Sequence, residues 1–161
     1  MSTEKLRFAK PYIIIGALLA GLAVVLGAFG AHGLKSVLNA QQLNTFEIGV
    51  RYQMYHALAL MLLPALSAFV SPKWANRVAF CFVTGTVLFS GSLYALAISG
   101  IKWFGPITPL GGLFMITGWI LLIAGLLVGP SKHKVSAQQS LTETDKISAK
   151  HVNQNKGAGN V

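Results

Sequence analysis

The chain has 161 residues, of which 53% are hydrophobic and only 11% are charged. Thirteen lysine and arginine residues stand against four acidic residues, which gives a formal net charge of +9. Ordinary soluble domains carry roughly a quarter charged residues. The composition therefore excludes a soluble enzyme with a carboxylate-rich site and an acidic disordered chain. It predicts an integral membrane protein with several spans.

Neither the basic charge nor the cysteine content indicates a nucleic-acid or cofactor site. Lysine and arginine flank the apolar runs and form no dense cluster with interleaved aromatic residues, so we expect no nucleic-acid partner. The single cysteine, Cys81, can form no internal disulfide and no paired-cysteine metal motif. It is interpreted as a small buried hydrophobe. We expect no cofactor.

The first predicted span runs from Tyr12 to Ala31 and follows a short basic N-terminus over residues 1–10. An uncharged run of this length suits a hydrocarbon core roughly 30 Å thick. A cleaved signal peptide ending at Ala28-Phe29-Gly30 is the competing interpretation. The run is too long for a typical signal peptide and further spans follow, so a retained span is favoured.

The second predicted span runs from Glu47 to Val70. Asn44 and Glu47 have the spacing of a capping box at its start, and Pro64 is a potential kink within it. In the preceding loop, Leu34, Val37 and Leu38 recur at helical spacing. This spacing predicts a short interfacial helix between the first two spans.

The third predicted span covers Val78 to Ile98, and the fourth covers residues 109–128. Thr108 and Pro109 resemble a helix cap followed by proline at the first helical position, and Gly129-Pro130 is a helix stop. Residues 11–129 are thus predicted to form an all-α, four-helix transmembrane bundle. Residues 130–161 are polar without apolar periodicity and are predicted to form a disordered cytoplasmic tail.

The distribution of basic residues predicts the orientation in the membrane. The larger group lies in the N-terminus, the loop before the third span and the start of the tail: Lys5, Arg7, Lys10, Lys73, Arg77, Lys132 and Lys134. The other two loops contain Lys35 and Lys102. Positive residues favour the cytoplasmic side, so both termini are expected in the cytoplasm.

Small residues recur at helical spacing on the predicted spans. Gly111, Gly118 and Gly125 fall every seven residues on one face of the fourth span, and Gly91 begins a similar series on the third. Small residues let membrane helices approach closely. The candidate packing face therefore comprises Gly91, Gly111, Gly118 and Gly125. Internal packing is favoured over docking onto another membrane protein, because four spans need several such contacts.

Polar residues gather near the outer ends of the first two spans. The candidate polar cluster comprises His32, Glu47, Arg51, Tyr52, Gln53, Tyr55 and His56. Glu47, Arg51 and Tyr55 share one helix stripe, and Tyr52 and His56 form an adjacent pair four residues apart. An ionisable residue at membrane depth is costly, so it needs a partner or a function.

The favoured interpretation of Glu47 and Arg51 is a structural ion pair. A proton or ion relay with His32 or His56 is an alternative, because histidine changes charge near neutral pH. Haem or metal ligation by the two histidines is a third, without a ligand-spaced motif to support it. No motif of a hydrolase, a P-loop or a dinucleotide site is present.

Four motifs carry a family resemblance: residues 27–34 (GAFGAHGL), 51–60 (RYQMYHALAL), 88–94 (LFSGSLY) and 105–112 (GPITPLGG), with Gly118-Trp119 following. Together they resemble the YgdD-like family of small bacterial inner-membrane proteins, domain of unknown function family 423. The resemblance covers roughly residues 10–129, and the polar tail departs from it. It implies a four-span inner-membrane protein without an assigned activity. It marks as motif positions His32, Tyr52, Gln53, His56, Ser90, Gly91, Pro109, Gly111 and Gly112.

These observations favour a non-enzymatic membrane protein that acts as an accessory or stabilising component of the membrane or of a membrane complex. Its expected partners are the lipid bilayer and either another membrane protein or a second copy of the chain. The alternative is a small-solute or proton permease that uses the polar cluster. A bundle this small leaves little room for alternating access and lacks evident inverted repeats. A haem-containing redox protein is the third hypothesis.

Overall fold

The computed structural model describes residues 3–130, which form four long α-helices and two short 3-10 helices and contain no β-strand. The α-helices are α1 (Thr3–His32), α2 (Ala40–Leu62), α3 (Pro72–Ser99) and α4 (Ile107–Val128). The 3-10 helices are η1 (Leu63–Ala68) and η2 (Lys102–Phe104). The all-α class is confirmed for this part of the chain. The predicted disordered tail lies outside the described residues, apart from Pro130.

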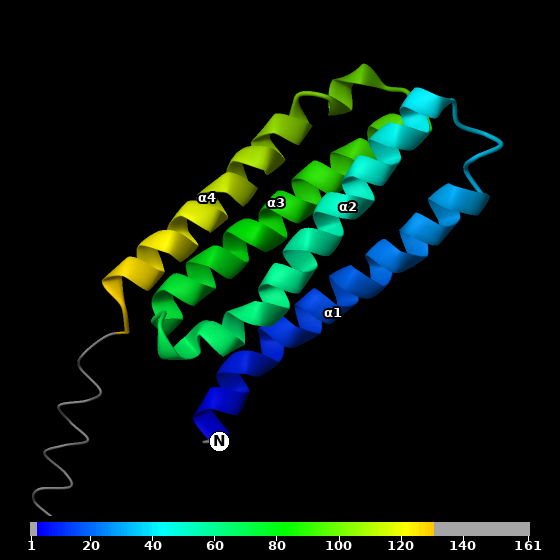
Figure 1. The fold of residues 1–161 in the computed structure, drawn as a ribbon. Helices are drawn as coiled ribbons and strands as arrows, with labels where there is room; N and C mark the ends of the chain where they lie inside the picture. Colours follow the sequence, from blue (N-terminus) through cyan, green and yellow to red (C-terminus); the bar gives the residue numbers. More distant parts are fainter. Residues whose placement is uncertain (1–2, 131–161) are drawn as a thin grey trace, which may run out of the picture. The chain divides into compact units, whose positions relative to one another are not determined.

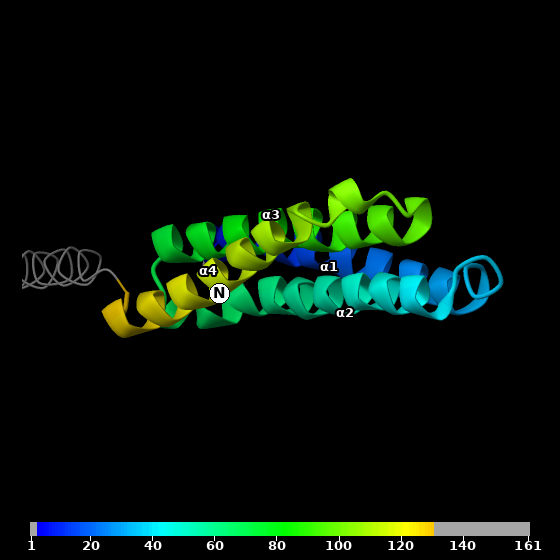
Figure 2. The same cartoon turned by 90° about the horizontal axis from the view of Figure 1, so that it is seen from above.

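Consecutive helices run in opposite directions and pack against their neighbours in chain order (Figure 1). The largest contacts join α1 to α2, α2 to α3, and α3 to α4. A view turned by 90° shows that α2 and α3 are offset from one another and do not lie in one flat layer (Figure 2). This arrangement places α2 between α1 and α3, with part of its surface left uncovered.

Two hydrophobic clusters hold the helices together. The larger combines Tyr12 of α1, Leu60 of α2, Phe82 of α3 and Leu122 of α4 with five further buried residues of the same cluster. The smaller joins the α1–α2 loop to α2 and α3 through Leu34, Phe46 and Ala97. The Tyr12 hydroxyl also donates a hydrogen bond to the side-chain oxygen of Asn76, which ties α1 to α3.

Helices α3 and α4 approach closely because glycines face each other across the contact. A Cβ on Gly85 would lie 2.9 Å from the backbone nitrogen of Met115 and 3.0 Å from the carbonyl oxygen of Gly111. A Cβ on Gly111 would overlap the backbone nitrogen of Phe89. Backbones this close leave no space for a larger side chain, as expected for helices that associate by close packing in lipid.

Three helical segments are long and apolar enough to cross a membrane: Ala9–His32, Pro72–Ser99 and Lys102–Val128. Helix α2 is not among them, because its sequence includes Asn44, Glu47, Arg51, Gln53 and His56. The described structure therefore contains three apolar candidate spans and one more polar helix packed against two of them.

The predicted interfacial helix between the first two spans is wrong. Residues 33–38 form turns, in which the amides of Gly33 and Leu34 both donate to the carbonyl of Phe29. Leu34 is buried against Phe46, whereas Val37 is 75% exposed. The apolar spacing therefore reflects the packing of buried Leu34 and partly buried Leu38 against the smaller cluster and not an amphipathic helix.

The second helix differs from the predicted span of 47–70 at both ends. Its capping box is formed by Asn39 and Gln42, whose side chains accept each other's backbone amides at 2.9 and 3.0 Å. The same type of spacing recurs at Asn44 and Glu47, so the sequence pattern alone predicts a start that is too late. Pro64 has no amide to continue the helix, so the chain tightens into η1 and the Leu63 amide donates to Leu60.

The third and fourth helices also differ from their predicted starts. Helix α3 begins at Pro72, six residues before Val78, because proline suits the first turn of a helix. It ends where Gly100 takes a φ of 70°. Helix α4 begins at Ile107, after Pro106 and not after Thr108, and ends where Gly129 takes a φ of 74°. Both terminal glycines have a positive φ, which other residues rarely adopt.

Candidate functional site: the polar faces of α2

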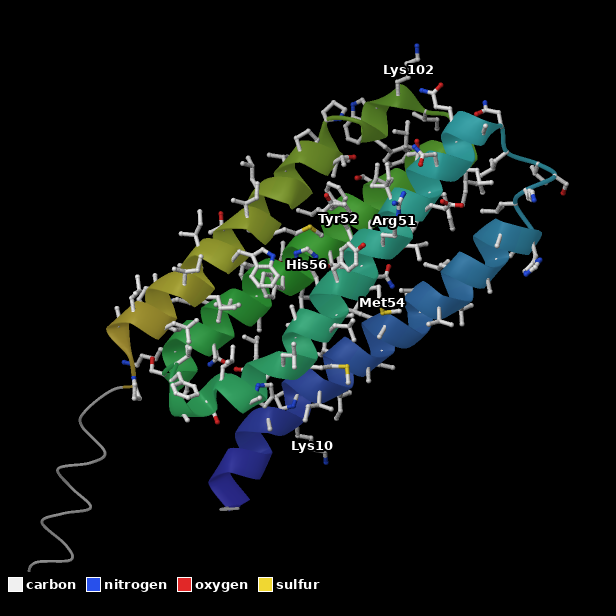
Figure 3. All side chains as sticks on the ribbon, in the orientation of Figure 1. Lys10, Arg51, Tyr52, Met54, His56 and Lys102 are labelled. Carbon is white, nitrogen blue, oxygen red and sulfur yellow. The ribbon has the colours of Figure 1, made fainter. Side chains whose placement is uncertain are left out.

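The predicted polar cluster does not form one site, because its members point to different sides of α2. Gln53 and His56 face inward and are only 3% and 4% exposed. Glu47, Arg51 and Tyr55 are exposed and face outward. They lie on the same side of α2, because residues four positions apart share one face of a helix. Tyr52 lies between the two sets, with its ring partly exposed (Figure 3).

Gln53 is hydrogen-bonded to the helices on both sides of α2. Its side-chain nitrogen donates to the carbonyl of Leu19 on α1 at 2.8 Å. Its side-chain oxygen accepts from the hydroxyl of Tyr94 on α3 at 3.0 Å. The Gln53 side chain thus joins three helices, and both its nitrogen and its oxygen are engaged in hydrogen bonds between helices.

His56 is hydrogen-bonded through both ring nitrogens. The indole nitrogen of Trp119 on α4 donates to Nε2 at 3.3 Å, and Nδ1 lies 2.8 Å from the carbonyl oxygen of Tyr52. Since an indole can only donate, Nε2 must be the acceptor. Nδ1 then bears the proton and donates to the Tyr52 carbonyl. This pattern fits the neutral imidazole.

An aromatic group surrounds His56. The rings of His56, Phe82 and Trp119 come from α2, α3 and α4, with centroids 5.0 to 6.1 Å apart. The Tyr52 ring packs against Phe89 of α3, with centroids 4.8 Å apart. The histidine is therefore enclosed by packed rings from neighbouring helices.

Hydroxyl groups on α3 form further contacts between helices. Ser90 donates to the carbonyl of Gly49 on α2 at 2.8 Å, and Ser92 lies 2.8 Å from the hydroxyl of Thr108 on α4. The Thr86 hydroxyl is the one buried side-chain polar atom without a hydrogen-bond partner in residues 3–130. Most of the buried polar side chains of this region are thus committed to interhelical bonds.

The outward residues Glu47, Arg51, Tyr52 and Tyr55 are called here the α2 outer face. The predicted ion pair between Glu47 and Arg51 is wrong, because no salt bridge joins them among the described residues. Instead, Nε of Arg51 lies 3.5 Å from the backbone carbonyl oxygen of Glu47, at the limit of a hydrogen bond. Tyr52 and Tyr55 are 42% and 56% exposed and meet edge to face. Neither charge therefore has an ion-pair partner among the residues that the structure describes.

Arg51 lies at the depth of the apolar part of α1. Val50, its chain neighbour, has its Cγ1 3.4 Å from where a Cβ on Gly27 would lie. Gly27 is within the uncharged run that ends at Ala31. Figure 3 shows Arg51 on the α2 ribbon between the end that bears Lys102 and the end that bears Lys10. The α2 outer face thus places a charged pair beside an apolar helix.

His32 does not join the other predicted residues. It lies exposed in the last turn of α1 and shares no hydrogen bond or ring contact with α2 among the described residues. In the same part of the chain, no group of three histidine, cysteine or acidic residues could hold a metal ion. A hollow of about 280 Å³ lies near the start of α2, lined by Asn39, Gln42, Thr45 and Lys102 among others, away from His56.

The predicted glycine face divides in the structure. Gly111, Gly118 and Gly125 of α4 are buried against Phe89, Phe82 and Trp74 of α3, respectively. Gly91 differs, because it is exposed and a Cβ there would meet no atom within 4 Å. It is not part of the α3–α4 contact.

Sequence reasoning missed two residues that complete the buried polar contacts. Tyr94 and Trp119 appeared only within the quoted motifs, yet they supply the donors for Gln53 and His56. Buried tyrosine and tryptophan usually find a hydrogen-bond partner. Their polar atoms were the available signal, but the sequence does not give the distances between helices.

The chain is similar to proteins that are called membrane proteins and whose names state no activity. The family model "Protein of unknown function (DUF423)" matches residues 26–112, more than half of the chain. A UPF0382 membrane protein of Staphylococcus saprophyticus is 47% identical over 116 residues, covering 72% of this chain and 96% of that protein. UPF0382 membrane protein YwdK of Bacillus subtilis is 45% identical over 115 residues, covering 71% and 94%. A UPF0382 membrane protein of Haemophilus influenzae is 42% identical over 114 residues, covering 71% and 91%. No solved structure matches the chain.

Proposed function

Since the chain belongs to the DUF423 family, whose curated relatives are called membrane proteins, we propose that it is a non-enzymatic component of a membrane protein assembly. Its inward polar residues hold the four helices together. Its α2 outer face contacts another polypeptide within the bilayer. In this proposal the chain binds another polypeptide and catalyses no reaction.

The observation that carries the proposal is that Glu47 and Arg51 lie on an exposed face beside apolar helices and form no ion pair within residues 3–130. A charge in the hydrocarbon region costs about 2.5 to 3.5 kcal/mol on insertion scales, even with snorkelling. Such residues almost always face other protein or water and not lipid tails. Contact with a second polypeptide would remove this cost and explain why α2 is less apolar than the other helices.

The permease alternative has less support. A transport path needs polar groups that can exchange partners with a solute, and those of the core, apart from the Thr86 hydroxyl, are engaged in hydrogen bonds within the protein. Gln53, His56 and Ser90 each bond to another helix or to their own backbone. The rings of Phe82, Phe89 and Trp119 fill the space beside them.

We further propose that all four helices cross the bacterial inner membrane, with both termini in the cytoplasm. Lys10 and Lys102 lie at opposite ends of the described structure (Figure 3). The start of α3, whose first turns contain Lys73 and Arg77, lies at the end of the bundle where α1 begins (Figure 1). The more basic end is expected to face the cytoplasm.

The proposal is tested by photo-cross-linking in native membranes. A photoreactive phenylalanine analogue replaces Tyr55, which is 56% exposed, and in a matched control it replaces Ile120 of α4, which is 59% exposed. Position 55 is expected to give a discrete protein adduct, whereas position 120 gives adducts with lipid alone. Lipid adducts alone from position 55 would contradict a protein-contacting role.

A further inference from the structure

Resting on the proposed function, we infer that the polypeptide that covers the α2 outer face is a second copy of this chain, paired through α2 about a two-fold axis. Both charges needed for the contact are present on this one stripe. A second copy presents the same stripe, so each Glu47 can meet the Arg51 of the other copy.

The geometry of a symmetric membrane dimer permits this pairing. Two copies inserted with the same orientation are related by an axis along the membrane normal, so their α2 helices run parallel. Glu47 and Arg51 are one turn apart, about 6 Å along the helix. A long arginine side chain spans that rise and reaches the carboxylate of the facing helix. The two-fold axis forms this pair twice and neutralises all four charges.

The apolar continuation of the stripe has the spacing of a helix–helix seam. Arg51, Tyr55, Leu58 and Leu62 follow one another at intervals of four, three and four residues. Tyr55, Leu58 and Leu62 are 56%, 48% and 62% exposed. This alternation is the repeat by which parallel helices interlock in left-handed pairs. The seam thus extends from the charged pair toward the middle of the bilayer.

A lipid headgroup is the less suitable occupant. A phosphate that bound Arg51 would lie one turn from the carboxylate of Glu47, whose charge repels it. Val50, the chain neighbour of Arg51, packs against Gly27 within the apolar run of α1. A second copy supplies both a carboxylate for the arginine and an apolar surface for Leu58 and Leu62.

The pairing is tested by cysteine cross-linking in native membranes of cells that produce the full chain. Cys81, the only native cysteine, is first replaced by serine. Single cysteines are then placed on the seam by Tyr55→Cys and Leu58→Cys. The matched controls are Val24→Cys on α1 and Ile120→Cys on α4, which are 61% and 59% exposed. A short bis-maleimide should give a covalent species of twice 17.1 kDa from the seam positions. The controls should remain single chains.

Charge reversal identifies the partner. In the Leu58→Cys background, Glu47→Arg or Arg51→Glu alone should abolish the cross-linked dimer, because like charges then meet across the seam. The double variant Glu47→Arg/Arg51→Glu should restore it. Both positions are exposed, and unchanged helical circular dichroism of the purified variants confirms that folding is retained.

The outcomes separate this inference from the proposed function. A photo-adduct at position 55 with a different protein, without a seam dimer, overturns the second copy but keeps the assembly role. Lipid adducts alone, without a seam dimer, overturn both. A dimer from the Leu58→Cys chain that is insensitive to charge reversal overturns the Glu47–Arg51 pairing.

Discussion

Trp119 of α4 donates its indole N–H to Nε2 of His56 on α2 at 3.3 Å, and this bond joins two helices that are not neighbours in the chain. The other ring nitrogen of His56 contacts the Tyr52 carbonyl at 2.8 Å. The histidine therefore acts as a neutral link with one donor and one acceptor. Packing and hydrogen bonding thus account for the position of His56 without the alternative role of a proton relay.

A double-mutant cycle should measure this link. His56→Leu and Trp119→Phe each remove one partner, and the two changes together should cost less stability than the sum of the single changes. The coupling is expected to be about 0.6 kcal/mol, the average for interhelical hydrogen bonds in membranes. Labelling of buried Cys81 during thermal unfolding in detergent reports the stability. Strict additivity would show that the two side chains do not interact.

Gln53→Leu should destabilise the chain more than Tyr94→Phe. The first change removes hydrogen bonds to both α1 and α3, whereas the second removes only the bond to α3. We expect losses of roughly 1–2 kcal/mol and about 0.6 kcal/mol, respectively, in the free energy of unfolding. The same Cys81 labelling assay measures both, and equal losses would show that the Leu19 contact contributes nothing.

Gly111→Leu should prevent correct packing of α4, whereas Gly91→Leu should be tolerated. A side chain at position 111 overlaps the backbone of Phe89, and one at position 91 meets no atom within 4 Å. The yield of folded protein after purification in mild detergent compares the two. A low yield from Gly91→Leu and a normal yield from Gly111→Leu would reverse the assignment of the packed face.

The proposed orientation predicts which ends react with an impermeant thiol reagent in intact cells. In a Cys81→Ser background, Lys102→Cys should be labelled from outside. Lys73→Cys should be labelled only after the membrane is opened. Both lysines are exposed in the structure, so a difference in labelling reports the side of the membrane and not burial. Labelling of both positions from outside would contradict a crossing of the membrane by α3.

The helical class and the three apolar spans could be predicted from sequence, because uninterrupted apolar runs are a strong local signal. The helix starts could not. Capping patterns recur within a few residues, at Asn39 and again at Asn44, and only packing decides between them. The loop predicted to contain a helix instead forms turns, in which Leu34 is buried. Its contact with Phe46 is not local in sequence and could not be predicted from spacing.

The predicted polar cluster contains residues that the structure places on separate faces of α2, together with His32, which does not contact them in the described residues. The spacing of Glu47, Arg51 and Tyr55 placed them on one stripe. Spacing alone could not show that Gln53 and His56 bond to other helices, since their partners Tyr94 and Trp119 lie far along the chain. Nor could it show that Arg51 turns toward the backbone carbonyl of Glu47 and not toward the Glu47 carboxylate.

The measurement that most directly tests the account is the mass of the solubilised assembly for two variants of α2, Gln53→Leu and Arg51→Leu, taken beside the unfolding temperature of each. The inner-face variant should unfold at a lower temperature yet keep its assembled mass at the storage temperature. The outer-face variant should keep the unfolding temperature of the single chain but lose the assembled mass. An Arg51→Leu chain that keeps its full assembled mass would contradict the division of α2 into a folding face and a docking face.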